Sequence, residues 1–595
     1  MKQFFKFVLA TMLGLFLTTG IIVILFFVLL AGIMSAAEDK DVKVDENSVL
    51  LVELKQPIDE RTPKDPFAEL SFLGLDKTKK IGLNDILANI KKAKTDDNIK
   101  GIFLNESYML SGQATTEEIR NSLLDFKKSG KFIVAYGEVY TQAFYYLASV
   151  ADKVYINPNG YFELSGFSSE TMFMKGALDK LGIEAQVIKV GTYKSYVEPF
   201  ILTKMSDANR MQVSSYLNSL YDHFLTGISK SRSINKDSLF NYANRMAIRD
   251  PKDALKYKLV DGLKYKDEIL NDLKKRTDVD QEDDLNSIEI GEYTHAASAK
   301  DEDDEESTSS RNRIAMVYAS GDINSGDGDA ESIGSEKLSK TLRMLRLDDK
   351  VKAVVLRVNS PGGSSLASDV IWREVSLTKK VKPVIVSMGD VAASGGYYIS
   401  CAADSIFAQP NTITGSIGIF AILPNMQKFF NEKLGLTFDG VKTGEYADLG
   451  DISRPLTPAE RAILQNMVNH GYDTFTKVVA DGRHKSQKYI DSIGQGRVWT
   501  GTQALKIGLV DRLGDINDAV KSAAKMAKLK NYKVVTYPEQ ESAFSKLGES
   551  FSVKIKTSML KSELGDSYQY YEQVNKLKSI MRVPQARLPF NTVIK

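Results

Sequence analysis

The sequence predicts an α/β protein in which two tandem, related domains of parallel βαβ units follow one N-terminal transmembrane helix. Three observations predict this fold. The chain repeats itself with a period of about 250 residues. Short runs of β-branched residues alternate with helical patterns in each repeat, and the N-terminus contains one long uncharged segment. Alternating strands and helices are typical of a parallel sheet covered by helices.

The N-terminal segment carries no charged residue from Phe7 to Met34. A helix over this segment would be about 42 Å long, more than the roughly 30 Å hydrocarbon core of a bilayer. Lys2 and Lys6 precede it and acidic residues follow it, so the positive-inside rule predicts a cytoplasmic N-terminus. We therefore expect residues 1–37 to form a cytoplasmic stub and an uncleaved anchor. Cleavage near the small residues 35–37 is the alternative.

The two halves of the remaining chain align with few gaps. TDDNIKGIFL at 95–104 matches LDDKVKAVVL at 347–356, VYTQAFYYLASVAD at 139–152 matches VAASGGYYISCAAD at 391–404, and ALKYKLVDGL at 254–263 matches ALKIGLVDRL at 504–513. The repeat predicts a first domain over 48–275 and a second domain over 313–540. Residues 276–312 include DEDDEESTSSR, a composition typical of a solvated acidic linker. Residues 541–595 match nothing in the first half and are expected to form a C-terminal tail.

The elements of the second domain follow from local patterns. Strands are predicted at 353–358 and 383–388, with a helix near 364–378 between them and another helix from about Ser394. Thr457-Pro458-Ala459-Glu460 predicts a helix start with a capping box, and Ser206 marks the equivalent start in the first half.

Composition limits the classes of function. The formal net charge is +2, from 78 basic and 76 acidic residues, so no large surface of one sign is required and nucleic-acid binding is not indicated. Cys401 is the single cysteine, which excludes an intramolecular disulfide and a thiolate metal cluster. We expect it to be a small buried hydrophobic residue. No metal or cofactor is indicated.

Residues that chemistry requires should differ between the duplicated halves, and two positions do. Gln142 stands in the first half where Ser394 stands in the second, and Ala447 stands in the second half where Lys194 stands in the first. Ser394 follows a predicted strand and opens a helix, where unpaired backbone N–H groups can stabilise an anion. Read alone, Ser-Gly-Gly at 394–396 is also an ordinary flexible turn.

A second glycine-rich turn, NSPGG at 359–363, follows the preceding predicted strand. Ligands gather at the carboxyl ends of parallel strands, so the two turns together predict an oxyanion hole with the amides of Gly363 and Gly395 as donors. The first half lacks both glycine pairs and should not stabilise an oxyanion.

A reactive serine needs a base. None of the four histidines lies in a glycine-rich turn, so a histidine triad is not indicated. A lysine can act instead if burial lowers its pKa, and Lys194 in VGTYKSYVEPF is a candidate. Taken alone, Lys194 would be read as a surface lysine.

VGTYKS, RVNSPGG, MGDVAASGGYY and TGSIGI together resemble the signal peptide peptidase A (protease IV) family in its long, two-domain form, over about residues 48–540. The resemblance implies two tandem Clp-protease/crotonase-like domains with repeated ββα units, and a Ser-Lys dyad built across them. It implies that Ser394 is the nucleophile and Lys194 the general base. It also implies that Ser416 positions the lysine and that the amides of Gly363 and Gly395 are the oxyanion donors.

The resemblance further implies a single-pass protein of the bacterial inner membrane, with its catalytic domains on the periplasmic side and assembled as a homotetramer. Its expected partners are membrane lipid, signal peptides and other apolar peptides, bound as added strands in a hydrophobic groove. Two alternatives remain: a crotonase-like acyl-CoA enzyme, because fold alone does not fix function, and an inactive scaffold that binds membrane peptides.

Overall fold

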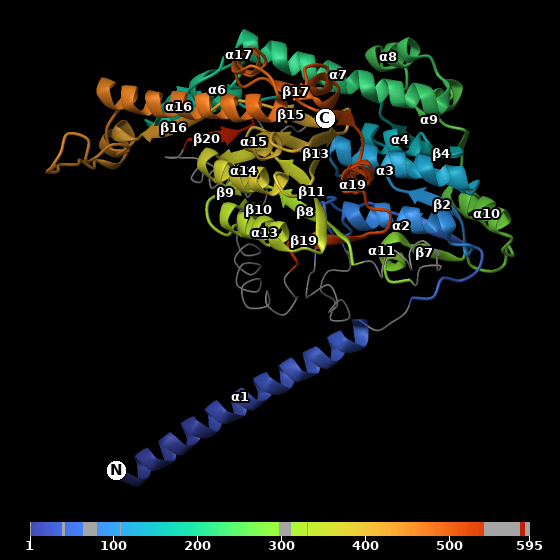
Figure 1. Ribbon diagram of the computed structural model, residues 1–595. Helices are drawn as coiled ribbons and strands as arrows, with labels where there is room; N and C mark the ends of the chain where they lie inside the picture. Colours follow the sequence, from blue (N-terminus) through green and yellow to red (C-terminus); the bar gives the residue numbers. More distant parts are fainter. Residues whose placement is uncertain are drawn as a thin grey trace.

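In the computed structural model, the described residues form three β-sheets that organise the body of the molecule (Figure 1). The structure describes residues 2–38, 42–63, 80–107, 109–296, 311–329, 331–540 and 584–588. Two of the sheets are mainly parallel and belong to the two sequence repeats, while the third is mixed and joins them.

The first sheet has the order β6-β4-β3-β2-β1-β7, and all of its pairings are parallel. Its strands are β1 (Ser48–Val52), β2 (Ile99–Asn105), β3 (Phe132–Tyr140), β4 (Lys153–Phe162), β6 (Gly262–Leu263) and β7 (Ser287–Glu289). Strands β2 and β3 read as nearly continuous apolar runs because helices cover the sheet.

The second sheet follows the order β17-β15-β13-β11-β8-β19, with β14 and β18 attached through β13. Its strands are β8 (Arg313–Ser320), β11 (Val351–Ser360), β13 (Val384–Ala393), β14 (Ser405–Ala408), β15 (Ile413–Gly415), β17 (Val498–Thr500), β18 (Arg512–Leu513) and β19 (Lys533–Tyr537). Only the β15–β17 pairing is antiparallel among those described. The strand predicted at 353–358 is confirmed as part of β11, and the strand predicted at 383–388 is confirmed as the first part of β13, which begins one residue later at Val384.

Helices connect and cover the strands. In the first half they are α2 (Leu83–Thr95), α3 (Gln113–Phe126), α4 (Gln142–Ala148), α5 (Lys175–Leu181), α6 (Glu198–Ile201), α7 (Asp207–Arg232), α8 (Lys236–Asn244), α9 (Pro251–Lys256), α10 (Lys266–Thr277) and α11 (Ile290–Tyr293). In the second half they are α13 (Ser335–Leu347), α14 (Ser365–Lys379), α15 (Gly395–Ser400), α16 (Pro458–Arg483), α17 (Gln487–Ile493), α18 (Gly501–Lys506) and α19 (Ile516–Met526). The predicted caps are confirmed, since Thr457 forms a capping box on α16 and the Ser206 side chain caps α7.

The mixed sheet brings the halves together in the order β10-β9-β12-β20-β16-β5. Its strands are β5 (Glu184–Lys189), β9 (Asp322–Asn324), β10 (Ser332–Gly334), β12 (Gly362–Ser364), β16 (Phe420–Asn425) and β20 (Gln585–Arg587). Strand β5, from the first half, pairs antiparallel with all of β16. The chain leading to Lys194 is therefore built into a sheet of the second half.

Helix α1 (Lys2–Glu38) projects away from the body (Figure 1). Among the described residues, no helix combines the length and apolar character that crossing a membrane requires. The side chains at 23 and 26–38, which include much of the predicted anchor, lie outside the described part. The transmembrane segment therefore stays a prediction.

The predicted linker over 276–312 is ordered in part. Strand β7 pairs with β1, and Tyr293 is fully buried and donates a 2.7 Å hydrogen bond to Asp96. Apolar side chains such as Ile288 and Tyr293 let this stretch pack on the first half of the chain despite its polar surroundings. Residues 297–310, with most of the acidic run, lie outside the described part.

The predicted tail over 541–595 is likewise not wholly separate from the body. Residues 541–583 and 589–595 lie outside the described part, but 584–588 include β20 of the mixed sheet.

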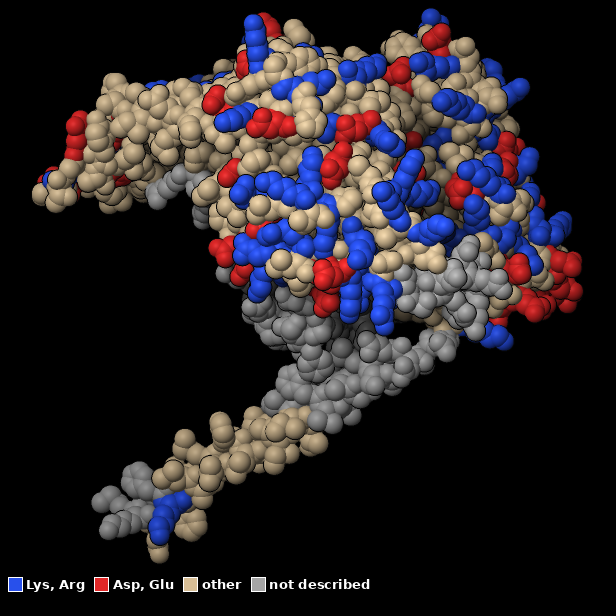
Figure 2. All heavy atoms as spheres, viewed as in Figure 1, with Lys and Arg blue, Asp and Glu red and all other residues tan. Residues whose placement is uncertain are grey.

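On the surface of the molecule, basic and acidic side chains are interspersed over the face seen in Figure 2, in keeping with the near-zero net charge.

Candidate active site

Lys194 is held at the junction of the two halves by backbone contacts with the second half. It directly precedes a short 3₁₀ helix, Ser195–Val197. The neighbouring Tyr193 N–H donates to the carbonyl of Gln495 at 2.8 Å. Gly496 has φ +78°, and a Cβ there would lie 2.6 Å from the Lys194 nitrogen. The lysine backbone can approach this closely only because residue 496 has no side chain.

Ser394 lies in the turn between β13 and α15. Its φ of 55° and ψ of −112° are an unusual combination for a residue that is not glycine. The turn is fixed on both sides, because the Ser394 N–H donates to Gly415 O and its carbonyl accepts from the Tyr398 N–H, each at 2.8 Å. Strain of this kind persists only where the surroundings impose it, and it is concentrated at functional sites.

The two side chains meet although 200 residues separate them in sequence. Lys194 Nζ lies 2.8 Å from Ser394 Oγ, and 3.0 Å from both the carbonyl oxygen and Oγ of Ser416. All three residues are 0% exposed. Ser416 itself has φ +52°, with its N–H donating to Arg497 O at 2.7 Å. The amine thus has three oxygen neighbours in fixed positions.

Burial lowers the pKa of the Lys194 amine well below its usual value. The surroundings are apolar, with the Phe420 ring centroid 6.0 Å from Nζ. A Cβ on Gly418 would lie 3.1 Å from Lys194 Cδ, so that glycine leaves room for the side chain. A neutral amine 2.8 Å from a hydroxyl can accept the hydroxyl proton.

The two glycine-rich turns touch each other beside Ser394. Gly362 has φ +101°, and a Cβ on it would lie 2.7 Å from the Gly395 nitrogen. Gly363 lies one residue further along β12, and Gly395 begins α15. The structure therefore brings together all five residues singled out in the sequence. Their roles stay predictions.

The C-terminal segment lies against these turns, which the sequence did not indicate. In the antiparallel register of β12 and β20, Gly363 is opposite Ala586. The pairing continues beyond the strand, where the Leu588 N–H donates to Pro361 O at 2.7 Å. A Cβ on Gly395 would lie 3.1 Å from the carbonyl oxygen of Ala586. A peptide carbonyl is thus presented to the backbone of the serine turn.

The described residues were also compared with the ligand sets that metal ions require. Over the described ranges, no group of three or more His, Cys, Asp or Glu side chains is arranged to hold a metal ion. His223 Nε2 lies 3.0 Å from Glu117 Oε2 within the first half. The chemistry that this geometry supports is nucleophilic attack by a serine whose proton passes to an amine.

Sequence comparison bears on the same residues. The model described as peptidase family S49 matches residues 125–280 and 376–530, together more than half of the chain. The chain belongs to peptidase family S49. In this family member Lys194 lies in the first matched segment, and Ser394 and Ser416 in the second. A Clp protease model also matches residues 306–414.

Curated relatives of this S49 peptidase cover most of its length. Protease 4 of Salmonella typhi is 38% identical over 496 residues, which are 81% of this chain and 78% of that protein. Protease 4 of Haemophilus influenzae is 36% identical over 477 residues, 78% and 75% of the two chains. Serine protease SPPA, chloroplastic, of Arabidopsis thaliana is 34% identical over 464 residues, 77% and 68% of the two chains.

Proposed function

We propose that this chain is a serine endopeptidase in which Ser394 is the nucleophile and Lys194 the general base and acid. The observation that carries the proposal is the 2.8 Å approach of Nζ to Oγ in a fully buried site. Burial, rather than a neighbouring charge, lowers the pKa of the lysine, so the amine can be neutral when it receives the serine proton.

The proposed reaction is acyl transfer in two steps. Lys194 takes the Ser394 proton as Oγ attacks the peptide carbonyl carbon, and the amides of Gly363 and Gly395 stabilise the oxyanion. Lys194 then gives its proton to the leaving nitrogen as the C–N bond breaks. Water attacks the acyl-enzyme, passes its proton through Lys194 to Ser394, and releases the acid. Ser416 keeps Nζ in place through its two contacts at 3.0 Å.

The proposed substrates are extended peptides that add a strand to β12. Strand β20 supports this mode, because it occupies that edge with a carbonyl beside Gly395. Remnant signal peptides and other apolar peptides are the proposed class. The resemblance to the signal peptide peptidase A family and the two relatives named Protease 4 support it.

Membrane attachment belongs to the same proposal. The uncharged stretch from Phe7 to Met34 lies within α1, and Phe16 on that helix is 78% exposed. We place the anchor in the bacterial inner membrane, with the catalytic domains on the periplasmic side. Flotation of the full chain with lipid vesicles, and its loss when residues 1–37 are removed, tests the anchor.

The decisive experiment is labelling with a fluorophosphonate, followed by mass spectrometry of the modified peptide. We expect the label on Ser394, and loss of both label and turnover in Ser394→Ala and Lys194→Ala. The exposed Ser492→Ala and Lys477→Ala are matched controls that should keep both. An unlabelled but folded wild-type chain would instead favour the acyl-CoA enzyme or the inactive scaffold, since neither has an activated serine.

A further inference from the structure

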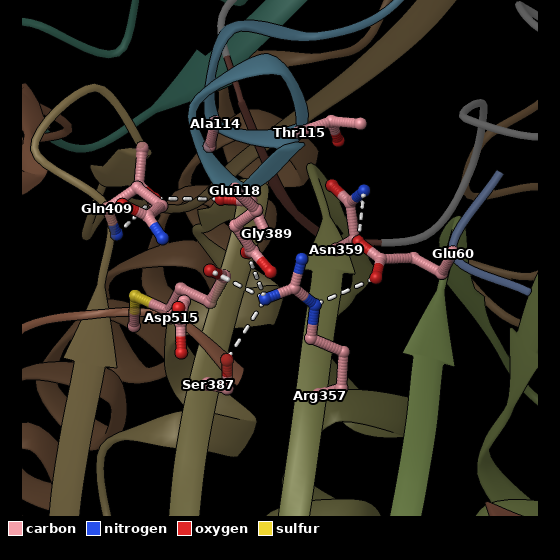
Figure 3. Close-up of polar contacts among 12 residues, drawn as sticks. Glu60, Ala114, Thr115, Glu118, Arg357, Asn359, Ser387, Gly389, Gln409 and Asp515 are labelled. Carbon is pink, nitrogen blue, oxygen red and sulfur yellow. Dashed lines mark hydrogen bonds and ion pairs between the residues drawn. The ribbon is translucent and has the colours of Figure 1, made fainter. Parts of the chain in front are cut away.

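A charged cluster lies buried between the two halves, on the strands β11 and β13 that lead into the glycine-rich turns (Figure 3). Its centre is Arg357 on β11. The guanidinium donates from Nε to Glu60 at 2.8 Å and from Nη1 to Glu118 at 2.7 Å. Nη1 also lies 3.0 Å from Ser387 Oγ and 3.3 Å from Met388 O. Both carboxylates come from the first half of the chain, and the arginine comes from the second.

Burying the charges of this cluster costs desolvation free energy. Arg357 is 0% exposed, Glu118 1% and Glu60 8%. One guanidinium faces two carboxylates, and desolvation together with the charge of Glu60 raises the pKa of Glu118 to about 7 despite Arg357. Apolar side chains in place of a buried ion cluster are often equally or more stable. Stability alone therefore does not explain why this interface contains charges.

The cluster is connected to the turn that contains Gly363 and to the end of the strand that leads into the Ser394 turn. Glu60 Oε1 accepts a 2.9 Å hydrogen bond from Asn359 Nδ2, and Asn359 Oδ1 accepts a 3.1 Å hydrogen bond from the Val391 N–H. Asn359 begins the turn that contains Gly363, and Val391 lies three residues before Ser394. One carboxylate of the first half thus holds the asparagine that bridges the two turns.

Helix α3 forms a second connection to the serine turn. Asp390, which adjoins Val391, accepts hydrogen bonds from the N–H groups of Ala114 and Thr115 at 2.8 and 2.9 Å, and from Thr115 Oγ1 at 2.6 Å. Glu118 lies one turn further along the same helix (Figure 3). The start of α3 and the Arg357 cluster therefore both fix, from the first half, the C-terminal part of β13 that leads into the Ser394 turn.

We propose that Glu60 and Glu118 are positioning residues for the reaction, holding the Gly363 and Ser394 turns in register through Arg357 and Asn359. The inference rests on the proposed function for its readout. The oxyanion donors belong to one turn each, so the distance between the turns decides whether both can reach one oxygen. In this view the first half supplies the alignment of the site as well as the lysine.

The test is kcat per active site, counted by fluorophosphonate titration of the full chain in detergent. Both oxygens of Glu60 accept hydrogen bonds, from Arg357 Nε and Asn359 Nδ2, and Glu60→Gln replaces one of these two acceptors by an NH2 group. Since losing one oxyanion donor costs about 10²–10³ in kcat, we expect displacement of a turn to lower kcat by about tenfold or more. KM should change much less than kcat, because an oxyanion donor acts mainly on the transition state rather than on the bound peptide.

Two variants separate positioning from folding. Glu374→Gln is the matched control: this carboxylate is 5% exposed and holds Arg343 and Arg346 at 2.8 and 3.2 Å, away from the turns. It should lower stability but leave kcat per site unchanged. Glu118 accepts from Arg357 through Oε1 alone, so Glu118→Gln can keep this acceptor and should retain near-normal kcat, whereas Glu118→Leu should not.

Equal kcat per site in Glu60→Gln and wild type would overturn the inference. If Glu60→Gln does not fold, Asn359→Ala carries the test, with the same expected loss and the same contradicting result. A wild-type chain without a labelled Ser394 would refute the proposed function. Normal wild-type turnover with unaffected variants would refute only the positioning role.

Discussion

Among single residues, Lys194 has the surroundings that most constrain the chemistry. An amine of ordinary pKa would be protonated at neutral pH and could not accept a proton from Ser394. Burial at 0% exposure favours the uncharged form, and the contacts with Ser416 keep Nζ directed at the hydroxyl. The same burial explains why Gly418 and Gly496 border the lysine, since larger residues would occupy its space.

The first prediction concerns pH. Because Lys194 has a lowered pKa and acts as a base when neutral, kcat/KM should rise with pH through that pKa and then level off well below pH 10.5. The measurement is a profile of kcat/KM with a peptide substrate that does not titrate between pH 5 and 10. A profile that rises only near pH 10.5, where an ordinary lysine titrates, would contradict the assignment of Lys194 as a base of lowered pKa.

The site residues were predictable to different degrees. Ser394 and Lys194 differ from their counterparts in the other half, and duplication exposes such differences. Their contact was beyond sequence reasoning, because it depends on the long-range pairing of β5 with β16. The Arg357 cluster could not be predicted from the sequence. A single arginine in an apolar strand does not indicate which carboxylates, distant in sequence, it contacts in the folded chain.

At the scale of elements, the sequence predicted those strands and helix starts that have a signal in neighbouring residues. The strands at 353–358 and 383–388 are recognisable from their runs of β-branched residues, and the caps at Thr457 and Ser206 depend on residues within one helical turn. Strand β20 does not: it has three residues, lies in a tail without a counterpart in the other half, and exists through pairing with β12 and β16. Such a strand has no periodicity to detect.

The second prediction concerns β20. Ala586 is 0% exposed and opposite Gly363, so Ala586→Arg should displace the strand from β12. A peptide substrate would then no longer compete with it, and we expect kcat/KM for a short peptide to rise severalfold. A synthetic peptide with the sequence PQARL should inhibit the variant more strongly than wild type. Unchanged kcat/KM and equal inhibition would show that β20 does not compete with substrate.

At the scale of the whole molecule, the interface between the halves carries the buried charges. Glu118 faces Arg357, Glu60 and Asp515, and its pKa is raised from 4.5 to about 7. The folded state therefore holds this proton more tightly than the unfolded chain does. The resulting stabilisation is complete below pH 4.5 and is lost as the pH rises through 7.

The third prediction follows from that titration. Glu118→Gln cannot ionise, so its stability relative to wild type should increase between pH 5 and pH 8, by on the order of 2 to 3 kcal/mol. Denaturant unfolding of both chains at the two pH values measures the difference, in which the other titrating groups cancel. A relative stability that does not change with pH would mean that Glu118 is ionised throughout this range.

The last prediction concerns assembly, which we propose to be a homotetramer. The arm over residues 426–456, between β16 and α16, extends from the body (Figure 1). It exposes large apolar side chains, with Phe438 59% and Val441 fully exposed, and exposed apolar surface of this kind typically marks an interface. Val441→Asp should shift the mass measured by light scattering from tetramer toward monomer.

Val381→Asp, at a residue 64% exposed in the α14–β13 turn, is the matched control and should leave the mass unchanged. An unchanged mass in Val441→Asp as well would show that copies of this chain do not associate through the arm.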